Sequence, residues 1–503
     1  MGVTRFERNK KEKVKLAEFP IGDFDDLDVR CARHLLNDLG NAQRLIDRHG
    51  GDIMFVQDVG WFAYRRGFWD REVGEMEVRK RAHATARAIM MREASGAAAA
   101  EEDGGLDDPG WAVALRGHGL ESGSSARVSA MIREAEPYLT RTIDDLDQNP
   151  FLVNVENGTV DLETGELRDH RRRDYITRQS PVIYNAAARC PQFEKFLAEI
   201  MPDEEIRSFL QRWFGYSMTG SIAEQVLTLH LGVGRNGKSV LMDLMNRLMG
   251  DYSLTLPFAS LLHDDRRSGA QASPDLARLP GARMVTASEP EVGSRFSEGL
   301  IKSLTGGEPL TVRHLNRDFF EFYPQFKLTL AANNKPQVRG KDDGIWRRIL
   351  LVPYRYQIPV DKIDTHLPAK LWSERSGILN WLISGAGDWL ESGLRTPMVI
   401  LDSTDTYRAE SDPLGRFLAM AVEDKTGTES LSATMLWKAW VHWCKDNAEE
   451  PKNSTWLGRQ MSDKGYEKTK VGTVYYTTIQ LTPEYKDALA RANAGPLEDA
   501  NNE

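Results

Sequence analysis

The stretch LGVGRNGKSV, residues Leu231–Val240, decides how the centre of this chain folds. The run QVLTLHL that leads into it is short and apolar, as in a buried strand, and apolar residues after it repeat at helical spacing up to Gly250. A strand, a glycine-rich turn and a helix in this order predict an α/β fold whose turn binds phosphate.

The turn contains the pattern GxxxxGKS, in which backbone amides and a helix N-terminus point at phosphate oxygens. Lys238 is predicted to contact the β and γ phosphates, and the Ser239 hydroxyl to coordinate Mg²⁺. ATP and Mg²⁺ are therefore the expected cofactors, and a chance match in a tight turn is the alternative. The predicted nucleotide-binding residues are Gly232, Val233, Gly234, Arg235, Asn236, Gly237, Lys238, Ser239 and Val240.

An acidic residue follows the next predicted strand. The segment ARMVTASEPE, residues 282–291, reads as an apolar strand that ends in Ser288 and Glu289. Glu289 is the candidate for polarising water, and together with Ser239 it forms the predicted metal site. Ser288 stands where such sites often have a second acid, and capping of a helix near Pro290 is the alternative role of Glu289.

Two further segments are expected near the same site. KLTLAANNKP, residues 327–336, predicts a strand ending in asparagines, whose amides can orient an attacking water; a simple Asn-Asn turn is the alternative. GIWRRILLVPY, residues 344–354, places Arg347 and Arg348 before another strand. They are either a solvated pair or finger arginines that reach the nucleotide of a neighbouring subunit.

The series GVGRNGKS, RMVTASEPE, SLTGGEPLTVRHL, FKLTLAANNKP and GIWRRILLVPY resembles the C-terminal helicase portion of the phage and plasmid primase-helicase family. That family is related to poxvirus primase-helicases and belongs to the superfamily 3 branch of AAA+ ATPases. The five motifs cover residues 221–357. Upstream, GNAQRLIDRHG and NPFLVNVENGTVDLETGEL resemble the domain that precedes this ATPase.

The resemblance implies a role for each motif residue. Lys238 and Ser239 receive the phosphate and Mg²⁺ roles, and Glu289 receives the acidic strand-end role. Asn333 becomes the sensor asparagine, and one or both of Arg347 and Arg348 become the finger. The resemblance also implies rings, usually hexamers, that move on single-stranded DNA in the 3′ to 5′ direction.

A basic hairpin is the candidate DNA contact. LTVRH, a turn around Asn316 and FFEFY predict a β-hairpin with a basic tip, which the resemblance places in the ring channel. Residues 302–348 contain nine lysines and arginines against five acids, in a chain whose net charge is −9. An interface rim is the alternative reading of this charge. The predicted DNA-binding residues are Lys302, Arg313, His314 and Arg317.

The C-terminal pattern predicts a winged-helix-like domain. A helical face runs from Met435 to Cys444, a second helix is expected near Trp456–Met461, and the turn KVG precedes the expected strand TVYYTTIQL. The segment also resembles the C-terminal domain of the family. It is expected either to touch duplex DNA through lysines or to be an inert packing domain.

The N-terminal half predicts an α+β structure. Residues 38–70 read as a helix followed by small strands, and ASGAAAAEEDGGLDDPG, residues 94–110, reads as a flexible linker. Strand patterns flank turns at Asn157-Gly158 and Thr164-Gly165. The run Arg171–Arg173 is either a phosphate contact or a solvated loop.

Length and composition bound the remaining possibilities. A chain of 503 residues predicts several domains, and three distant cysteines without a CxxC pair indicate a reducing cytoplasm. The charged N-terminus and the absence of a long apolar run predict no secretion and no membrane. The expected divisions are an N-terminal α+β region (1–93), a linker (94–110), a helicase-preceding α+β domain (111–220), an ATPase core (221–357), a helical lid (358–410), a winged-helix-like domain (411–490) and a disordered tail (491–503).

The leading expectation is an ATP-driven replicative DNA helicase of a bacteriophage or related mobile element, acting in the cytoplasm of a bacterial host. Its expected partners are single-stranded and forked DNA, further copies of itself in a hexamer, and replication proteins such as a primase, a polymerase or a single-strand-binding protein. One alternative is a primase-helicase; the early start of the ATPase-preceding domains and the lack of a zinc-binding cysteine cluster weigh against it. The other is an origin-binding initiator that uses ATP to assemble.

Overall fold

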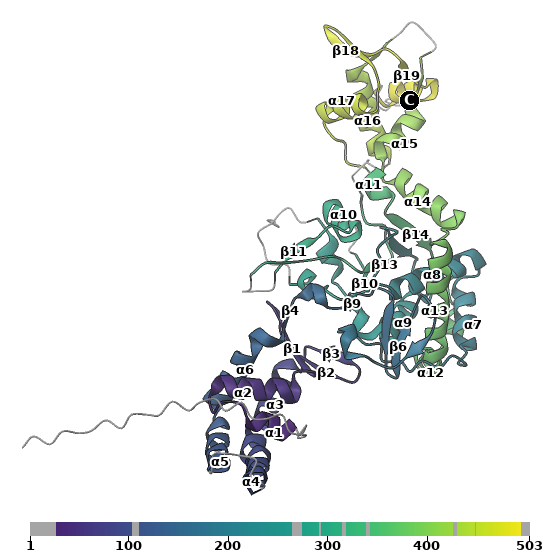
Figure 1. The fold of residues 1–503 in the computed structure, drawn as a ribbon. Helices are drawn as coiled ribbons and strands as arrows, with labels where there is room; N and C mark the ends of the chain where they lie inside the picture. The colour runs from purple at the N-terminus through teal and green to yellow at the C-terminus, as the bar shows by residue number, and fades with distance from the viewer. Residues whose placement is uncertain are drawn as a thin grey trace, which may run out of the picture. The chain divides into compact units, whose positions relative to one another are not determined.

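The computed structural model describes residues 27–102, 110–263, 274–290, 293–313, 318–338, 343–425, 430–447 and 449–493 (Figure 1). The chain forms two compact units. The N-terminal unit consists of the chain up to Gln148 and of His170–Thr177. The C-terminal unit consists of Asn149–Asp169 and the chain from Arg178 onward.

The N-terminal unit has a four-stranded sheet in the order β3-β2-β1-β4, with β1 and β4 parallel and the other neighbours antiparallel. The helix and strands predicted for residues 38–70 are confirmed. The elements of this unit are α1 (Leu27–Ala32), α2 (Asp38–His49), β1 (Ile53–Val56), β2 (Gly60–Arg65), β3 (Phe68–Asp70), α3 (Gly74–Ala88), a π-helix (Ile89–Glu93), α4 (Ala94–Glu102), α5 (Trp111–Ser122), α6 (Ser125–Leu139) and β4 (Thr140–Arg141).

The two faces of this sheet are covered differently. Successive side chains of a strand point to opposite faces. Ile53 and Trp61 belong to one core cluster, which contains apolar residues of α2, α3 and α6. Met54 and Phe62 belong to a second cluster, against which Tyr175 packs. Long helices therefore cover one face, and part of the segment His170–Thr177 packs on the other.

The linker predicted at residues 94–110 was wrong in its first half. Ala94–Glu102 is the helix α4, because alanine has the highest helix propensity and because Ala94 and Ala97 are buried in a cluster with residues of α5. Residues 103–109 lie outside the described part of the chain.

The domain predicted at residues 111–220 is also corrected, because it is divided between the two units. Val128 and Met131 of α6 pack with Leu45 of α2 in the core of the N-terminal unit. The predicted hairpin at Asn157-Gly158 is confirmed and belongs to the C-terminal unit, as do the helices that follow it.

The C-terminal unit begins with a small antiparallel sheet in the order β5-β6-β7. Its elements up to the last strand of the main sheet are β5 (Leu152–Val155), β6 (Gly158–Asp161), β7 (Leu167–Arg168), α7 (Pro191–Ile200), α8 (Glu204–Met218), β8 (Leu227–Leu231), α9 (Lys238–Met249), β9 (Ser253–Thr255), β10 (Met284–Ser288), α10 (Glu298–Gly306), β11 (Leu310–Val312), β12 (Phe320–Phe322), β13 (Lys327–Ala332), α11 (Asp343–Trp346) and β14 (Ile349–Pro353).

The main sheet of this unit is parallel and has the order β14-β8-β13-β10-β9. The strands predicted before the glycine-rich turn, before Ser288-Glu289, before Asn333 and after Arg348 are all confirmed. β8, β13 and β10 are consecutive in the sheet, so their carboxyl ends lie at one edge. The mixed α/β fold class predicted from the sequence is therefore found, with a parallel sheet at its centre.

Side chains on alternate positions of the strands enter two different cores. Leu350 and Val352 of β14 belong to a cluster with residues of α8, α9 and α13 (Arg375–Ser392). Ile349 and Leu351 belong to a cluster with residues of α10 and with Tyr407. The sheet is thus buried on both faces, as parallel sheets are.

The remaining elements are α12 (Leu367–Ser373), α13, α14 (Met398–Glu410), α15 (Pro413–Ala421), β15 (Val422–Asp424), β16 (Leu431–Ser432), α16 (Ala433–Asp446), α17 (Ser454–Asp463), β17 (Lys468–Val471), β18 (Thr473–Tyr476), β19 (Ile479–Leu481) and α18 (Pro483–Asn493). The Ser432 side chain caps α16 by accepting from the backbone of Met435. The single strand expected in TVYYTTIQL was wrong, because β18 pairs with β16 and β17 whereas β19 pairs with β15. Among the described helices, none has the length and apolar character of a membrane span.

Candidate nucleotide-binding site

The loop between β8 and α9 has the backbone shape that its glycines predict. Gly234, Arg235 and Gly237 have φ angles of 56°, 49° and 74°, in the left-handed region that favours glycine. A Cβ at Gly232 would lie 2.3 Å from Nδ2 of Asn236, so the backbone there is too closely packed for a side chain. The loop is therefore a tight turn that exposes backbone amides at the start of a helix.

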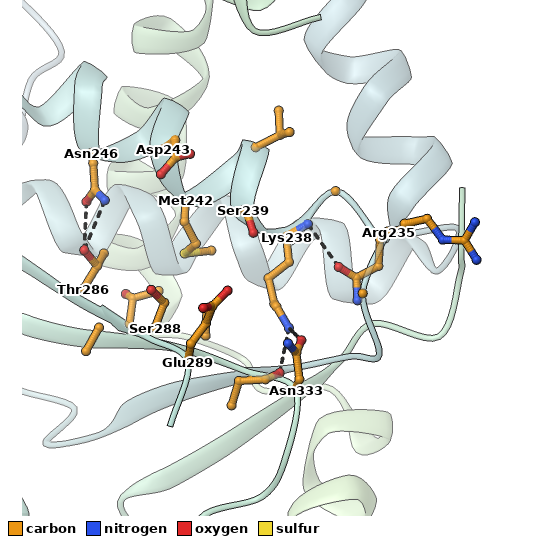
Figure 2. Close-up of a pocket in the computed structure, with 18 of the residues that line it drawn as sticks. Arg235, Lys238, Ser239, Met242, Asp243, Asn246, Thr286, Ser288, Glu289 and Asn333 are labelled. Atoms are coloured by element: carbon orange, nitrogen blue, oxygen red, sulfur yellow. Dashed lines mark hydrogen bonds between the residues drawn. The ribbon is translucent and has the colours of Figure 1, made fainter. Parts of the chain in front are cut away.

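A cavity of about 400 Å³ lies beside this loop (Figure 2). Of the predicted site residues, Glu289 and Asn333 line it together with residues of the loop, whereas Gly232, Val233, Arg347 and Arg348 do not. The lining residues include Gly234, Arg235, Asn236, Gly237, Lys238, Ser239, Val240, Asp243, Asn246, Thr286, Ser288, Glu289 and Asn333.

Lys238 is held by oxygen atoms from two strand ends. Its ammonium donates to the carbonyl oxygens of Gly232 at 3.0 Å and Ala332 at 2.6 Å, and to Oδ1 of Asn333 at 3.1 Å (Figure 2). Burial lowers the pKa of Lys238 to about 8, and the nearby Glu289 carboxylate partly opposes this shift. The site thus contains a buried ammonium group, and the nearby Glu289 carboxylate favours its protonated form.

Asn236 and Ser239 bring polar groups to the same cavity. Asn236 is 3% exposed and accepts from the backbone N–H of Lys238 at 3.3 Å. Its Nδ2 donor is buried without a hydrogen-bond partner among the described residues. Ser239, the second residue of α9, is exposed and lines the cavity. A ligand with several acceptor oxygens fits these donors.

Glu289 follows the last residue of β10. Its backbone N–H donates to the carbonyl of Ala331 at 3.0 Å, and its φ of 62° is unusual for a residue other than glycine. Figure 2 draws the Glu289 carboxylate between the side chains of Ser288 and Lys238. The turn therefore directs the carboxylate into the cavity beside the lysine.

The sequence did not single out a polar network at the other end of the cavity. Nδ2 of Asn246 donates to Oγ1 of Thr286 at 3.1 Å, and Oγ1 of Thr255 lies 3.0 Å from the same hydroxyl. Asp243 of α9 also lines the cavity, one helical turn after Ser239. The helical spacing of residues 239, 243 and 246 is the signal that could have identified this lining face.

The two adjacent arginines have different environments. Arg348 is 8% exposed and donates to Oγ1 of Thr305 at 3.1 Å and to the carbonyl of Gly344 at 2.5 Å. Arg347 is exposed. Arg348 therefore ties α10 to the start of β14, whereas the Arg347 side chain extends toward solvent.

The last turn of α14 contacts both the segment after Asn333 and the short helix α11 before Arg347. The Tyr407 hydroxyl donates to the carbonyl of Pro336, and Lys335 forms an ion pair with Glu410. Arg408 pairs with Asp343, the first residue of α11, at 2.6 Å. One helical turn therefore connects the segment after Asn333 with the helix just before Arg347.

The structure covers only part of the predicted DNA contact. β11 and β12 form the predicted antiparallel hairpin, with Leu310 opposite Phe322. The guanidinium of Arg313 lies 4.7 Å from the ring centre of Phe319, and Lys302 is a half-buried residue of α10. His314 and Arg317 lie outside the described residues.

Known protein families match two parts of the chain. A family described as D5 N terminal like matches residues 42–202, and a family of unknown function (DUF5906) matches residues 230–348. The second match contains the glycine-rich loop and the strand ends around the cavity.

Viral proteins are similar over larger parts. "Putative helicase L207/L206" of Acanthamoeba polyphaga mimivirus is 29% identical over 62% of this chain and 34% of its own length. "Putative helicase 184R" of Invertebrate iridescent virus 6 is 31% identical, over 44% of this chain and 24% of its own length. "Putative primase C962R" of African swine fever virus is 26% identical, over 44% and 24%. The matched part of this chain thus spans about a quarter to a third of the length of these relatives.

A solved structure described as "The apo structure of NrS-1 C terminal region (305-718)" aligns with 88% of this chain and 99% of its own, at 11% identity and a TM-score of 0.46. The D5 N terminal like match lies upstream of the motif series of residues 221–357, in the region that contains NPFLVNVENGTVDLETGEL and all but the first two residues of GNAQRLIDRHG. The chain thus carries a D5 N terminal like match over residues 42–202, and it is similar to viral proteins named as putative helicases and primases.

Proposed function

We propose that this protein is an ATP-dependent DNA helicase that works as a ring and translocates on single-stranded DNA. The observation that carries the proposal is that Lys238 and Ser239 at the start of α9, Glu289 after β10 and Asn333 after β13 line one cavity. This cavity lies at the carboxyl ends of the adjacent parallel strands β8, β13 and β10. Ligands of parallel α/β sheets bind at the carboxyl ends of the strands.

ATP and Mg²⁺ fit the donor set of this cavity. The exposed loop amides, the unpaired Nδ2 of Asn236 and the ammonium of Lys238 are donors for phosphate oxygens. Ser239 and Glu289 offer the oxygen ligands that Mg²⁺ prefers. Bound Mg²⁺ would neutralise charge on the β and γ phosphates.

The roles of the protein groups follow from their positions. Lys238 exchanges its carbonyl partners for phosphate oxygens. Glu289 accepts a hydrogen bond from the attacking water and orients it, and Asn333 contacts the γ phosphate. Asn333 already contacts the Lys238 ammonium, so it is positioned to respond when that ammonium moves to a phosphate.

The environment of Arg347 supports a ring. Arg347 is exposed and does not line its own cavity, whereas Arg348 is internal. We assign Arg347 as the finger that completes the ATP site of a neighbouring subunit, in a hexamer of AAA+ subunits of the superfamily 3 type. The finger stabilises charge in the transition state, so hydrolysis depends on a second copy of the chain.

The C-terminal elements and the viral relatives support further parts of the proposal. The helices between residues 358 and 410 form the lid of the ATPase. α16, α17 and the hairpin β17–β18 support a winged-helix-like domain. Movement is 3′ to 5′ on single-stranded or forked DNA, in the company of a primase, a polymerase and a single-strand-binding protein. The viral relatives support an origin in a virus or mobile element. Within that class we propose a bacteriophage or related mobile element whose protein acts in the bacterial cytoplasm.

A second candidate is the helicase module of a primase-helicase. The matched relatives are about three to four times as long as the part that this chain covers, and one of them bears the name primase. This candidate keeps the same ATP site and adds a priming activity from a longer protein.

The proposal is tested first by ATP hydrolysis. Wild type is expected to release phosphate from MgATP faster when single-stranded DNA is added. Lys238→Ala should reduce the rate to background, whereas Lys195→Ala, at an exposed lysine of α7, should not. Hydrolysis by Lys238→Ala at the wild-type rate would remove this cavity as the ATP site.

A further inference from the structure

The sheet of the N-terminal unit has one face covered by aromatic side chains rather than by long helices. Phe62 and Trp69 form its buried layer, and Tyr64 and Tyr175 pack against them. Sheet faces with accessible aromatic rings are a recurring platform for unpaired bases. Here the rings occur together with arginines.

The segment His170–Thr177 is held in the N-terminal unit by hydrogen bonds to its backbone groups. The Trp69 N–H donates to the carbonyl of Ile176 at 2.8 Å, and its indole Nε1 donates to the carbonyl of Arg172 at 2.9 Å. The N–H of Thr177 donates to Oδ1 of Asp147 at 2.8 Å. The arginines of the segment are therefore displayed from an anchored backbone.

Guanidinium groups and aromatic rings are interleaved. The Arg172 guanidinium lies 5.0 Å from the ring centre of Tyr64, and that of Arg141 lies 5.3 Å from Tyr175. The Arg141 guanidinium also donates to the Tyr175 hydroxyl at 3.1 Å. Trp69 and Tyr175 are stacked, with ring centres 6.1 Å apart and planes at 20°. These contacts hold two of the arginines over ring faces.

The face is basic within an acidic chain. Residues 64–71 and 170–177 contain six arginines and two aspartates, whereas the whole chain has a net charge of −9. Asp52 offsets part of this charge, because it pairs with Arg172 at 2.7 Å and with Arg81 at 3.1 Å.

Three exposed arginines place further positive charge at the edge of this face. Arg171 and Arg173 are exposed on either side of Arg172, and Arg66 is exposed at the tip of the β2–β3 hairpin. The tip is next to the segment, because a Cβ on Gly67 would lie 2.3 Å from the His170 ring.

We propose that this basic aromatic surface binds single-stranded DNA. Exposed arginines contact phosphates, and the ring and guanidinium planes stack with unpaired bases, which a duplex does not offer. The binding is separate from the ATP cavity and does not rest on hydrolysis. The surface consists of Tyr64, Arg66, Arg141, Arg171, Arg172, Arg173 and Tyr175.

The experiment measures the affinity of the full chain for a fluorescent thymidine 30-mer by anisotropy, without nucleotide, over a series of salt concentrations. The variant is Arg171→Ala with Arg173→Ala. The matched control is Arg87→Ala with Arg133→Ala, which removes two exposed arginines from helices α3 and α6 of the same unit. Circular dichroism and thermal unfolding establish that both variants fold.

The test variant is expected to bind at least about 10-fold more weakly. The slope of log Kd plotted against log salt concentration should fall by about 1.4, or about 0.7 for each lost phosphate contact. The control should match wild type, and basal ATPase should persist in both. DNA should also slow amide hydrogen exchange in residues 170–177. Equal affinity of test variant and wild type, an equal loss in the control, or tighter binding of a 30-base-pair duplex than of the single strand would overturn the proposal. Absence of ATP hydrolysis by wild type would instead contradict the proposed helicase function and would leave the proposal for this surface unaffected.

Discussion

The ammonium of Lys238 lies 3.1 Å from Oδ1 of Asn333, which joins the start of α9 to the end of β13. This contact brings together two residues that are far apart in the sequence and that the sequence had assigned to one site. It also places the lysine in a buried position that lowers its pKa to about 8.

The pH dependence of ATP binding follows from that pKa. Bound phosphate favours the protonated lysine, so binding above pH 8 requires uptake of a proton by Lys238. The Kd for ATP is expected to rise about 10-fold between pH 7 and pH 9, measured by titration of MgATP. Lys238→Arg keeps its charge in this range and should bind with a flat pH dependence. A flat profile for wild type would contradict the depressed pKa.

Replacement by alanine should have different effects at Arg347 and at Arg348, on catalysis in the first case and on stability in the second. Arg348→Ala removes a charged donor from Thr305 and Gly344, so we expect a loss of about 2 to 3 kcal/mol in the free energy of unfolding. Arg347→Ala should change stability by less than about 0.5 kcal/mol but lower kcat for ATP by about 10³-fold.

Subunit mixing separates a finger from a local role. A mixture of Arg347→Ala and Lys238→Ala subunits contains interfaces with an intact lysine on one side and an intact arginine on the other. Such mixtures should recover ATPase activity that neither variant has alone. No recovery at any ratio, in oligomers shown to exchange subunits, would assign Arg347 to its own subunit.

Two glycines of the loop offer a matched comparison. Gly234 and Gly237 both have positive φ, so alanine at either should cost about 1 to 2 kcal/mol. A Cβ at Gly237 would in addition lie 2.6 Å from Cγ2 of Ile200, whereas none of the described atoms crowds Gly234. Gly237→Ala should therefore unfold at lower denaturant than Gly234→Ala, and Ile200→Ala in the same chain should narrow the difference. Equal midpoints would show that crowding by α7 is unimportant.

The contact between Tyr407 and the carbonyl of Pro336 is expected to position the sensor segment. Tyr407→Phe leaves a buried carbonyl without its donor, at a cost of about 1 to 3 kcal/mol. Tyr485→Phe removes a similar hydroxyl contact, to the carbonyl of Ala439, in the C-terminal helices. Both variants should lose stability, but only Tyr407→Phe should lower kcat while KM stays close to wild type. Equal kcat values in the two variants would leave Tyr407 with a structural role alone.

Much of the candidate site was predictable because its signals are local. Ser288 ends one short apolar strand, Glu289 follows it, and Asn333 follows another, and the parallel order of those strands brings their ends together. The different environments of Arg347 and Arg348 were not predictable, because the burial of Arg348 involves Thr305, which is 43 positions away in the chain.

The misjudged parts depend on tertiary packing. Residues Ala94–Glu102 have a small and acidic composition that is typical of a linker, but burial of Ala94 and Ala97 makes them a helix. The docking of His170–Thr177 in the N-terminal unit follows from contacts with Trp69 and Asp147, and nothing in the local pattern of three arginines indicates it.

The central claim is tested most directly by strand separation of a forked duplex with ATP and Mg²⁺, using tails of each polarity. Wild type is expected to unwind forks that carry a 3′ tail on the translocating strand, and Lys238→Ala is expected to bind the fork without separating it. Wild type that hydrolyses ATP with stimulation by DNA, yet separates neither kind of fork, would contradict the helicase account.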